Sequence, residues 1–346
     1  MAEANNKKAI TDFITAHPNV SSKEIEEGLQ SMAIATIKRA LKKLVYDNQI
    51  LVKGRGKATR YEVSPGYELL RPINVADYFT KEIDERTIKT GFNHTLIPEV
   101  LAKSRIFTVE ESQKLQKLQS IYIEKSSQLT TFEYKKEQER LAIDLSWKSS
   151  QIEGNTYSLL ETERLLKDKE TASGKPKDDA TMLLNHKEVI DFIIEQPAYV
   201  SPLTVPAIED IHSILIKDLG VDRNMRTHRV GVSGTNYKPL DNQFQIKEAL
   251  ENMCQLVNNQ ELVFTKALLA LVLISYIQGF ADGNKRTARI ISNALLISNR
   301  YCPISFRTID SVEYKKAMLI FYEQNNIMPV KDIFINQFEF AVNTYF

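Results

Sequence analysis

Residues 276–289 read Tyr-Ile-Gln-Gly-Phe-Ala-Asp-Gly-Asn-Lys-Arg-Thr-Ala-Arg, a short polar turn between two apolar segments. The flanking segments, 267–277 and 290–296, have the composition of buried helices. Gly283 permits backbone conformations that other residues disfavour, so that neighbouring amides can converge on an anion. These amides begin the second helix, where the helix dipole favours phosphate. The stretch therefore predicts a phosphate site at a helix–loop–helix junction.

The charges of this turn suit a nucleotide. Lys285, Arg286 and Arg289 supply positive charge, and arginine can bind a phosphate through two parallel hydrogen bonds. Asp282 is the single carboxylate of the turn, and its hard oxygen atoms suit a Mg²⁺ ion that arrives with the phosphates. An Asp-Gly-Asn turn is also ordinary loop chemistry, so the turn alone leaves a purely structural role open.

The full stretch resembles the signature of the Fic (filamentation induced by cAMP) family, His-x-Phe-x-Asp/Glu-Gly-Asn-Gly/Lys-Arg-x-x-Arg. The matching residues are Phe280, Asp282, Gly283, Asn284, Lys285, Arg286 and Arg289. The resemblance implies a mainly α-helical Fic-fold bundle with a small β-hairpin flap. It also implies that Asp282 holds Mg²⁺ and that ATP is bound by Gly283, Asn284, Lys285, Arg286 and Arg289.

One departure from this signature concerns the chemistry. Gln278 stands where the family has its catalytic histidine, which acts there together with the arginine that corresponds to Arg286. The histidine is the general base for the target hydroxyl, a task that suits an imidazole whose pKa is near neutrality. A glutamine amide has no useful basicity. We therefore expect an intact phosphate site without its base; whether Gln278 is natural or a change in an active parent stays open.

Length and composition predict a folded chain of two or three units. The 346 residues exceed one typical domain, and the net charge of +1 gives no global field that favours nucleic acid or membrane. No apolar run reaches the roughly 18 residues that a bilayer span needs, and the first residues lack a signal-peptide core. We expect a cytoplasmic protein without a membrane partner, whose two cysteines are reduced core residues.

Residues 1–65 predict a separate α+β unit. Three helical patterns precede two short strands, which flank a glycine-rich basic turn. This order resembles a winged helix-turn-helix domain, whose third helix enters the DNA major groove while the hairpin contacts phosphate. The expected DNA contacts are Lys38, Lys42, Lys53, Arg55 and Lys57. The alternative is a module for protein contact, with these side chains as a solvated face.

The rest of the chain divides into two parts. Residues 66–110 mix polar and apolar patterns, and we expect a bridging segment without an assigned role. Residues 111–346 are expected to form the Fic domain, which includes helices at about 131–149 and 178–196. His186 on the second of these helices is expected to be structural rather than catalytic.

The end of the first helix carries a second motif. Residues 149–154, Ser-Ser-Gln-Ile-Glu-Gly, resemble the inhibitory motif of the family, with Ser149, Glu153 and Gly154 in register. The resemblance implies an inhibitory helix around 131–155 whose Glu153 pairs with Arg289. A carboxylate at that place would repel the γ-phosphate of ATP. The alternative is a plain helix C-cap, with the glycine in a left-handed turn.

Residues 226–239 are expected to form a β-hairpin, because Val230 and Val232 alternate before a Ser-Gly-Thr-Asn turn. They resemble the flap of the family, Arg-x-x-x-Val-x-Val-x-Gly-x-x-Tyr-x-Pro, which docks a protein target by strand pairing and leans on the nucleotide. The nucleotide contacts expected here are Ser233, Gly234 and Thr235. His228 is the histidine near this element, and it is a poor candidate to replace the base.

A last segment, residues 308–314, resembles the Asp-x-x-x-Tyr segment of the family, whose tyrosine lies near the adenine. This implies a nucleotide contact at Tyr314. Lys285 matches the Doc-type toxins, which transfer the γ-phosphoryl group, but those proteins lack the second arginine that is present here as Arg289. AMP transfer is therefore the favoured binding mode.

The resemblance implies a protein adenylyltransferase that moves AMP from ATP to a protein hydroxyl with Mg²⁺. We expect it to be autoinhibited by Glu153 and weak or inactive because of Gln278. Two alternatives are a catalytically dead nucleotide sensor and a DNA-binding regulator that acts through residues 1–65. The expected partners are ATP, an unidentified target protein on the flap 226–239, DNA at residues 1–65 and, as in many family members, a second copy of the chain.

Overall fold

The computed structural model describes residues 2–47 and 49–346, which form two compact units. The first unit comprises the chain up to Pro72 together with Pro98–Thr108, and the second comprises Ile73–Ile97 and Val109–Phe346. These boundaries differ from the predicted ones. The segment 66–110, which we expected to be one bridge, is divided between the two units.

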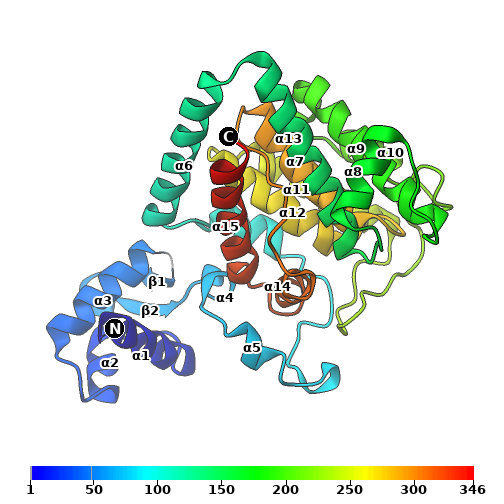
Figure 1. Ribbon diagram of the computed structural model, residues 1–346. Coiled ribbons are helices and arrows are strands. Elements are labelled where there is room, and N and C mark those ends of the chain that lie inside the picture. The colour runs from blue at the N-terminus through cyan, green and yellow to red at the C-terminus, as the bar shows by residue number, and fades with distance from the viewer. Residues whose placement is uncertain (1, 48) are drawn as a thin grey trace. The chain divides into compact units, whose positions relative to one another are not determined.

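The first unit begins with three helices and a hairpin (Figure 1). Its elements are α1 (Ala2–Ala16), α2 (Ser22–Gly28), α3 (Ile34–Tyr46), β1 (Ile50–Lys53), the 3₁₀ turn η1 (Gly56–Ala58), β2 (Arg60–Val63) and α4 (Pro65–Leu70). The strands are antiparallel, with Ile50 opposite Val63 and Lys53 opposite Arg60. The helices pack on a core of Ile10, Ile14, Ile25, Ile37, Leu41, Leu44 and Ile50. The order of three helices and a basic hairpin is the order that the sequence pattern predicted.

The second unit is a helical bundle (Figure 1). Its α-helices are α5 (Val75–Tyr78), α6 (Val109–Gln128), α7 (Thr131–Ile152), α8 (Leu159–Asp168), α9 (Lys177–Glu195), α10 (Val205–Leu215), α11 (Gln243–Asn258), α12 (Val263–Ile277), α13 (Asn284–Ser298), α14 (Ser311–Gln324) and α15 (Met328–Thr344). Short turns η2 (Ile83–Glu85) and η5 (Pro197–Val200) lie in the same unit, while η3 (Leu96–Val100) crosses the boundary and η4 (Leu101–Lys103) follows it in the first unit.

The helix α12 is the centre of this bundle. All of its residues except Lys266 are buried, which is the pattern of a helix surrounded by others. Its neighbours α11, α13, α14 and α15 pack against it. Because α12 and α13 are joined by the loop 278–283, the burial of both helices fixes the position of that loop.

The helix α7 extends beyond the predicted end at Ser149. Thr130 begins it with a reciprocal capping box to Glu133, and Glu153 is its C-cap residue. Gly154 then turns the chain with a φ of 103°, which an L-residue with a side chain rarely adopts. The carboxylate of Glu153 is thereby fixed at a helix end.

The predicted β-hairpin at residues 226–239 is wrong. The structure assigns no strand to these described residues, and their one bridge pairs Lys238 with Gly91, outside the expected hairpin. The segment is held instead by Arg226, whose guanidinium donates to the carbonyl oxygens of Gln278, His228 and Leu240. Side-chain anchoring replaces the strand ladder that the alternation of valines had indicated.

Two further expectations concern the chain as a whole. Cys254 and Cys302 are buried and form no disulfide, and burial raises the pKa of the Cys254 thiol to about 12. Among the residues described here, no helix has the length and apolarity that crossing a bilayer requires.

Candidate functional site

The loop between α12 and α13 is built around Gly283. This residue has a φ of 81°, and a Cβ added to it would lie 3.0 Å from Ile216 Cγ2 and 3.2 Å from the His212 ring. Both the conformation and the close approach require glycine. Gly283 is also the N-cap of α13, so the first amides of a fifteen-residue helix point out of this loop. The predicted anion site at this helix end has the geometry that it needs.

Asn284 closes the loop from inside. Its side-chain oxygen accepts from the Phe280 amide at 2.9 Å, and its Nδ2 donates to the Phe280 carbonyl at 2.8 Å. The same Nδ2 lies 3.2 Å from Gln278 Oε1. Asn284 is therefore a structural support of the loop.

Gln278 is bound at both ends of its amide. Its Nε2 donates to the Ser275 carbonyl at 2.6 Å, while its Oε1 accepts from Asn284. The backbone of Gln278 is left-handed, with a φ of 53°, at the C-cap of α12. The side chain thus completes the end of a helix, and it offers no basic atom to the site.

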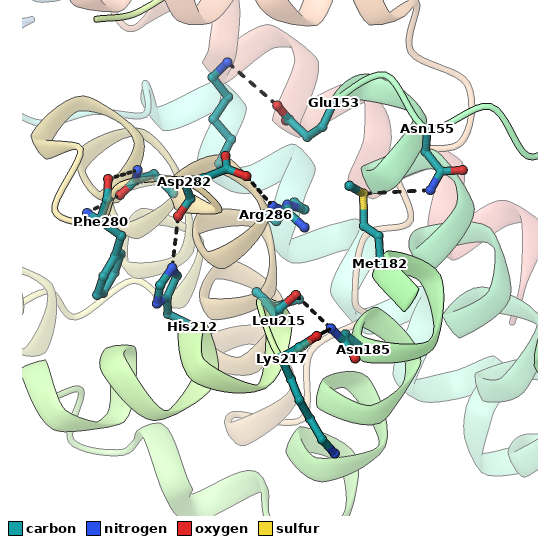
Figure 2. A network of polar contacts seen from close by, with 12 residues as sticks. Glu153, Asn155, Met182, Asn185, His212, Leu215, Lys217, Phe280, Asp282 and Arg286 are labelled. Carbon is teal, nitrogen blue, oxygen red and sulfur yellow. Dashed lines mark hydrogen bonds and ion pairs between the residues drawn. The ribbon is translucent and has the colours of Figure 1, made fainter. Parts of the chain in front are cut away.

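Figure 2 shows Asp282 between His212 and Arg286. Asp282 Oδ2 accepts from Arg286 Nη2 at 3.0 Å, and His212 Nε2 lies 2.9 Å from the Asp282 carbonyl oxygen. His212 stacks on Phe280 with ring centres 3.7 Å apart, and burial lowers its pKa. His212 is a residue that the sequence analysis missed; its position on α10 gave no motif signal. It supports the loop as a buried neutral ring.

Glu153 lies against Arg289, as the resemblance implied. Arg289 Nη2 donates to Glu153 Oε1 at 2.8 Å, and Lys285 Nζ lies 3.8 Å from Glu153 Oε2. Arg289 also donates from Nε to Ser149 Oγ at 2.8 Å and from Nη2 to the Ser149 carbonyl at 2.9 Å. Its guanidinium lies 5.4 Å from the ring centre of Tyr314. Arg289 is wholly buried by these contacts.

The charge of Glu153 is maintained by its neighbours. Burial by itself raises the pKa of this carboxyl, but the charges of Arg289 and Lys285 outweigh burial, and the pKa lies below its ordinary value. The carboxylate is therefore ionised at neutral pH. It places a negative charge beside the only fully buried arginine among the described residues.

Two cavities meet at this pair. The smaller, of about 140 Å³, is lined by the loop and the flap, including Asp282, Gly283, Lys285 and Arg286. The larger, of about 570 Å³, is lined by Tyr314 and other residues of α14, by Gly234 and by the segment 79–86. Glu153, Ser233 and Lys285 line both cavities. Together they form a continuous site with a phosphate-sized end and a larger, more apolar end.

The segment 79–86 forms one wall of the larger cavity, which no sequence pattern had predicted. Arg86 Nη1 lies 3.1 Å from Glu323 Oε1, and both side chains are almost wholly buried. Arg86 Nη2 donates to the Gly234 carbonyl at 2.9 Å, so this arginine joins the flap to α14. Phe79 and Ile83 add apolar surface to the larger cavity. No motif in residues 66–110 could have revealed contacts that span more than 140 residues.

Some predicted residues lie outside the cavities. Thr235 lines neither cavity, and its hydroxyl accepts from the Tyr237 amide at 3.0 Å. His228 is exposed on the flap, and His186 is wholly buried with a pKa that burial lowers well below its usual value. Within the described part of the chain, no group of three or more His, Cys, Asp or Glu side chains is arranged to hold a metal ion.

In the first unit, Lys38, Lys42, Arg55 and Lys57 are exposed. Lys53 is exposed too, but its Nζ lies 2.7 Å from Glu62 Oε1 on the neighbouring strand. This ion pair neutralises part of the positive charge that we expected to contact DNA.

The comparisons with known proteins agree with one another in the family that they indicate. Residues 202–296 match the model of the Fic/DOC family. The chain is 28% identical over 180 residues to a protein named protein adenylyltransferase Fic from Nematostella vectensis, and the match covers 48% of this chain and 40% of the relative. The chain thus spans less than half the length of that curated relative.

Solved structures share the fold. Fic-1 from C. elegans (residues 134–508) has a TM-score of 0.57 at 16% identity, with 68% of this chain and 72% of that chain covered. A Fic domain-containing signalling protein from Bacteroides thetaiotaomicron has a TM-score of 0.57 at 19% identity, with 67% and 95% covered. At such identity these likenesses show the fold alone. Residues 202–296 thus match a Fic/DOC domain, and the second unit shares the fold of these Fic structures.

Proposed function

We propose that this chain is an autoinhibited protein of the adenylyltransferase type, in which AMP transfer is weak or absent. The observation that carries the proposal is the ion pair of Glu153 with Arg289 at the meeting point of the two cavities. An ionised carboxylate adds negative charge to the end of a cationic phosphate site, where a neutral residue would be cheaper to bury. A blocking role explains it.

The binding mode follows from the shape of the site. The triphosphate of ATP fits the end that contains the first amides of α13 together with Lys285 and Arg286. The base fits the larger end, beside Tyr314. Proteins of this kind typically use ATP with Mg²⁺, and Asp282 suits such an ion because its carboxylate is largely exposed and only one of its oxygens pairs with Arg286. The ion would neutralise phosphate charge.

Autoinhibition follows from charge. The terminal phosphate of a bound ATP needs a cation, and Nε and Nη2 of Arg289 already donate to Ser149 and Glu153. A phosphate that approached this end would also meet the carboxylate of Glu153, and like charges repel. ATP therefore binds weakly, or in an unproductive pose, until Glu153 moves.

The missing step is proton removal. In AMP transfer, a hydroxyl oxygen of the target bonds to the α-phosphorus while the bond to pyrophosphate breaks, and the hydroxyl proton must pass to a base. The amide of Gln278 is not basic, and both of its ends are already hydrogen-bonded. General-base catalysis is worth roughly 10²–10⁴-fold, so we expect transfer to be reduced by about that factor.

The test uses Glu153→Gly protein with Mg²⁺ and ATP labelled on its α-phosphate, beside the same protein with Gln278→His. We expect label on protein only, or far more strongly, with the histidine variant. Equal label on both would mean that another group supplies the base. ATP binding to Glu153→Gly without label on either variant would instead support a catalytically dead nucleotide sensor.

A second function rests on the first unit. Its helix α3 and its hairpin tip expose Lys38, Lys42, Arg55 and Lys57, and a basic face of this kind on a winged helix suits DNA phosphate. We propose DNA binding as an additional role of this unit.

A further inference from the structure

A third cavity, of about 520 Å³, lies within the second unit among α6, α7, α9 and α13. It shares no lining residue with the two cavities described above. Its volume is in the range of small-molecule sites, which is roughly 300–1,000 Å³. The inner wall is aliphatic and is formed by Leu141, Leu145, Ile190 and Ile193. The cavity therefore suits the apolar body of a ligand.

The rim of this cavity carries several polar side chains, and Arg300 is the charged one among the described lining residues. Gln138, Arg300 and Tyr301 line it, and within the described residues their side chains form no hydrogen bond or ion pair with the protein. No aspartate or glutamate is among the lining residues of the described chain. A set of free donors that includes an arginine favours a ligand with an anionic group.

Arg300 occupies an unusual position. It follows the C-cap of α13 and has a φ of 61°, a left-handed conformation in which glycine or asparagine is usual at a helix end. The side chain at this position is an exposed cation at the rim of an apolar cavity. An observed backbone outlier of this kind is a reason to look for a function.

We infer that this cavity binds an amphipathic carboxylate. Its apolar body lies between α7, α9 and α13, and its carboxylate is held by the Arg300 guanidinium, with the Tyr301 hydroxyl as a further donor. The apolar wall supplies the affinity through burial, and the cationic rim supplies the preference for an acid over a neutral ligand of the same length.

The site is physically connected to Glu153 and Arg289. Leu145 lies one helical turn before Ser149 on α7, and Asn293 lies one turn after Arg289 on α13. Asn293, which lines the cavity, donates from Nδ2 to the Arg289 carbonyl at 3.1 Å. A ligand between the two helices changes their spacing, and so weakens the contact of Glu153 with Arg289. This coupling rests on the proposed function, whereas the binding does not.

The binding experiment is isothermal titration of the full chain with decanoate and, separately, with 1-decanol, without nucleotide. We expect Arg300→Gln to weaken decanoate binding about tenfold and to leave 1-decanol within twofold, because it removes a charged hydrogen-bond donor. Lys136→Gln, on an exposed lysine of α7 outside the cavity, is the matched control and should change neither affinity. Ala142→Leu, which fills the cavity from α7, should weaken both probes.

Two results would overturn the binding inference: no decanoate binding to the wild-type chain, or equal weakening of both probes by Arg300→Gln. For the coupling, we expect saturating decanoate to tighten ATP binding at least about fivefold in the wild type and not at all in Glu153→Gly. If Glu153→Gly binds no ATP, the proposed function fails while the decanoate result stands. If both ligands bind without affecting each other, the site is not an effector site.

Discussion

Glu153, the residue that ends α7, and Arg289, one turn inside α13, are joined by a hydrogen-bonded ion pair of 2.8 Å across 136 residues of sequence. The arginine is wholly buried, and its Nε and Nη2 also donate to Ser149 on the same helix as Glu153. The pair therefore holds two helices together as well as covering the end of the phosphate site. Its removal should affect both stability and binding.

The first prediction concerns pH. Because the pKa of Glu153 is lower in the folded state, its charge stabilises the fold above the unfolded pKa of about 4.3, and this contribution disappears as the pH falls through the folded value. Glu153→Gln should lower the free energy of unfolding by about 2 kcal/mol at pH 7, and the difference from wild type should shrink below pH 4. Urea titrations followed by Trp147, the only tryptophan in the chain and a residue of α7, measure this. A difference that is constant with pH would contradict the assignment.

The second prediction concerns the buried pair of Arg86 and Glu323. Arg86→Met leaves the Glu323 carboxylate buried without its cation, so the free energy of unfolding should fall by roughly 3–5 kcal/mol. Lys114→Met is the matched control, since its pair with Glu339 is solvent-exposed and should contribute less than about 1 kcal/mol. Equal losses in the two variants would show that the segment 79–86 is not anchored as described.

The third prediction separates two reasons why a position requires glycine, which are its backbone conformation and the lack of space for a side chain. Gly283 and Gly174 both have positive φ, at 81° and 74°, but only Gly283 has heavy atoms within 4 Å of an added Cβ. Gly174→Ala should therefore lower the free energy of unfolding by only about 1 kcal/mol, the cost of placing an alanine in a left-handed backbone conformation. Gly283→Ala should cost a further 1 kcal/mol or more, through overlap with His212 and Ile216. Urea unfolding compares the two variants; similar losses would mean that the loop can relax away from α10.

The fourth prediction concerns DNA. If the hairpin tip contacts phosphate, replacing Arg55 and Lys57 by alanine should lower duplex affinity and reduce the slope of log K against log salt by about 2. Lys23→Ala is a suitable control, because this lysine is an exposed residue of α2 with a partner in Glu27. Fluorescence anisotropy with a labelled random duplex at several salt concentrations is the measurement. An unchanged slope in the double variant would exclude the hairpin tip as a phosphate contact.

Local chemistry made the helix junction predictable. The helices on either side of residues 278–283 and the need for Gly283 follow from short patterns, because each depends on neighbouring residues. The pairing of Glu153 with Arg289 was implied by the family resemblance and not by a local pattern. The flap was not predictable in the same way. Alternating valines at 230 and 232 indicated strands, yet the backbone is fixed by Arg226 at the start of the segment and by Arg86 from outside it.

Long-range contacts explain the other misses. Arg86 contacts Gly234 and Glu323, and His212 contacts Asp282; neither arrangement leaves a periodicity or a spacing that a single sequence can show. The domain boundary expected near residue 65 stays a prediction. Proline and glycine residues indicated a turn near residue 65, whereas the compact units are defined by which side chains pack together.

The flap is fixed at two points, by Arg226 near its start and by Arg86 at Gly234. A segment held in this way is a fixed wall of the site and not a lid, since moving it would break the hydrogen bonds of Arg226 at one end and the bond from Arg86 to the Gly234 carbonyl at the other. Nucleotide exchange should then need no opening of the flap. The rate-limiting motion would belong to the carboxylate of Glu153, which only has to rotate away.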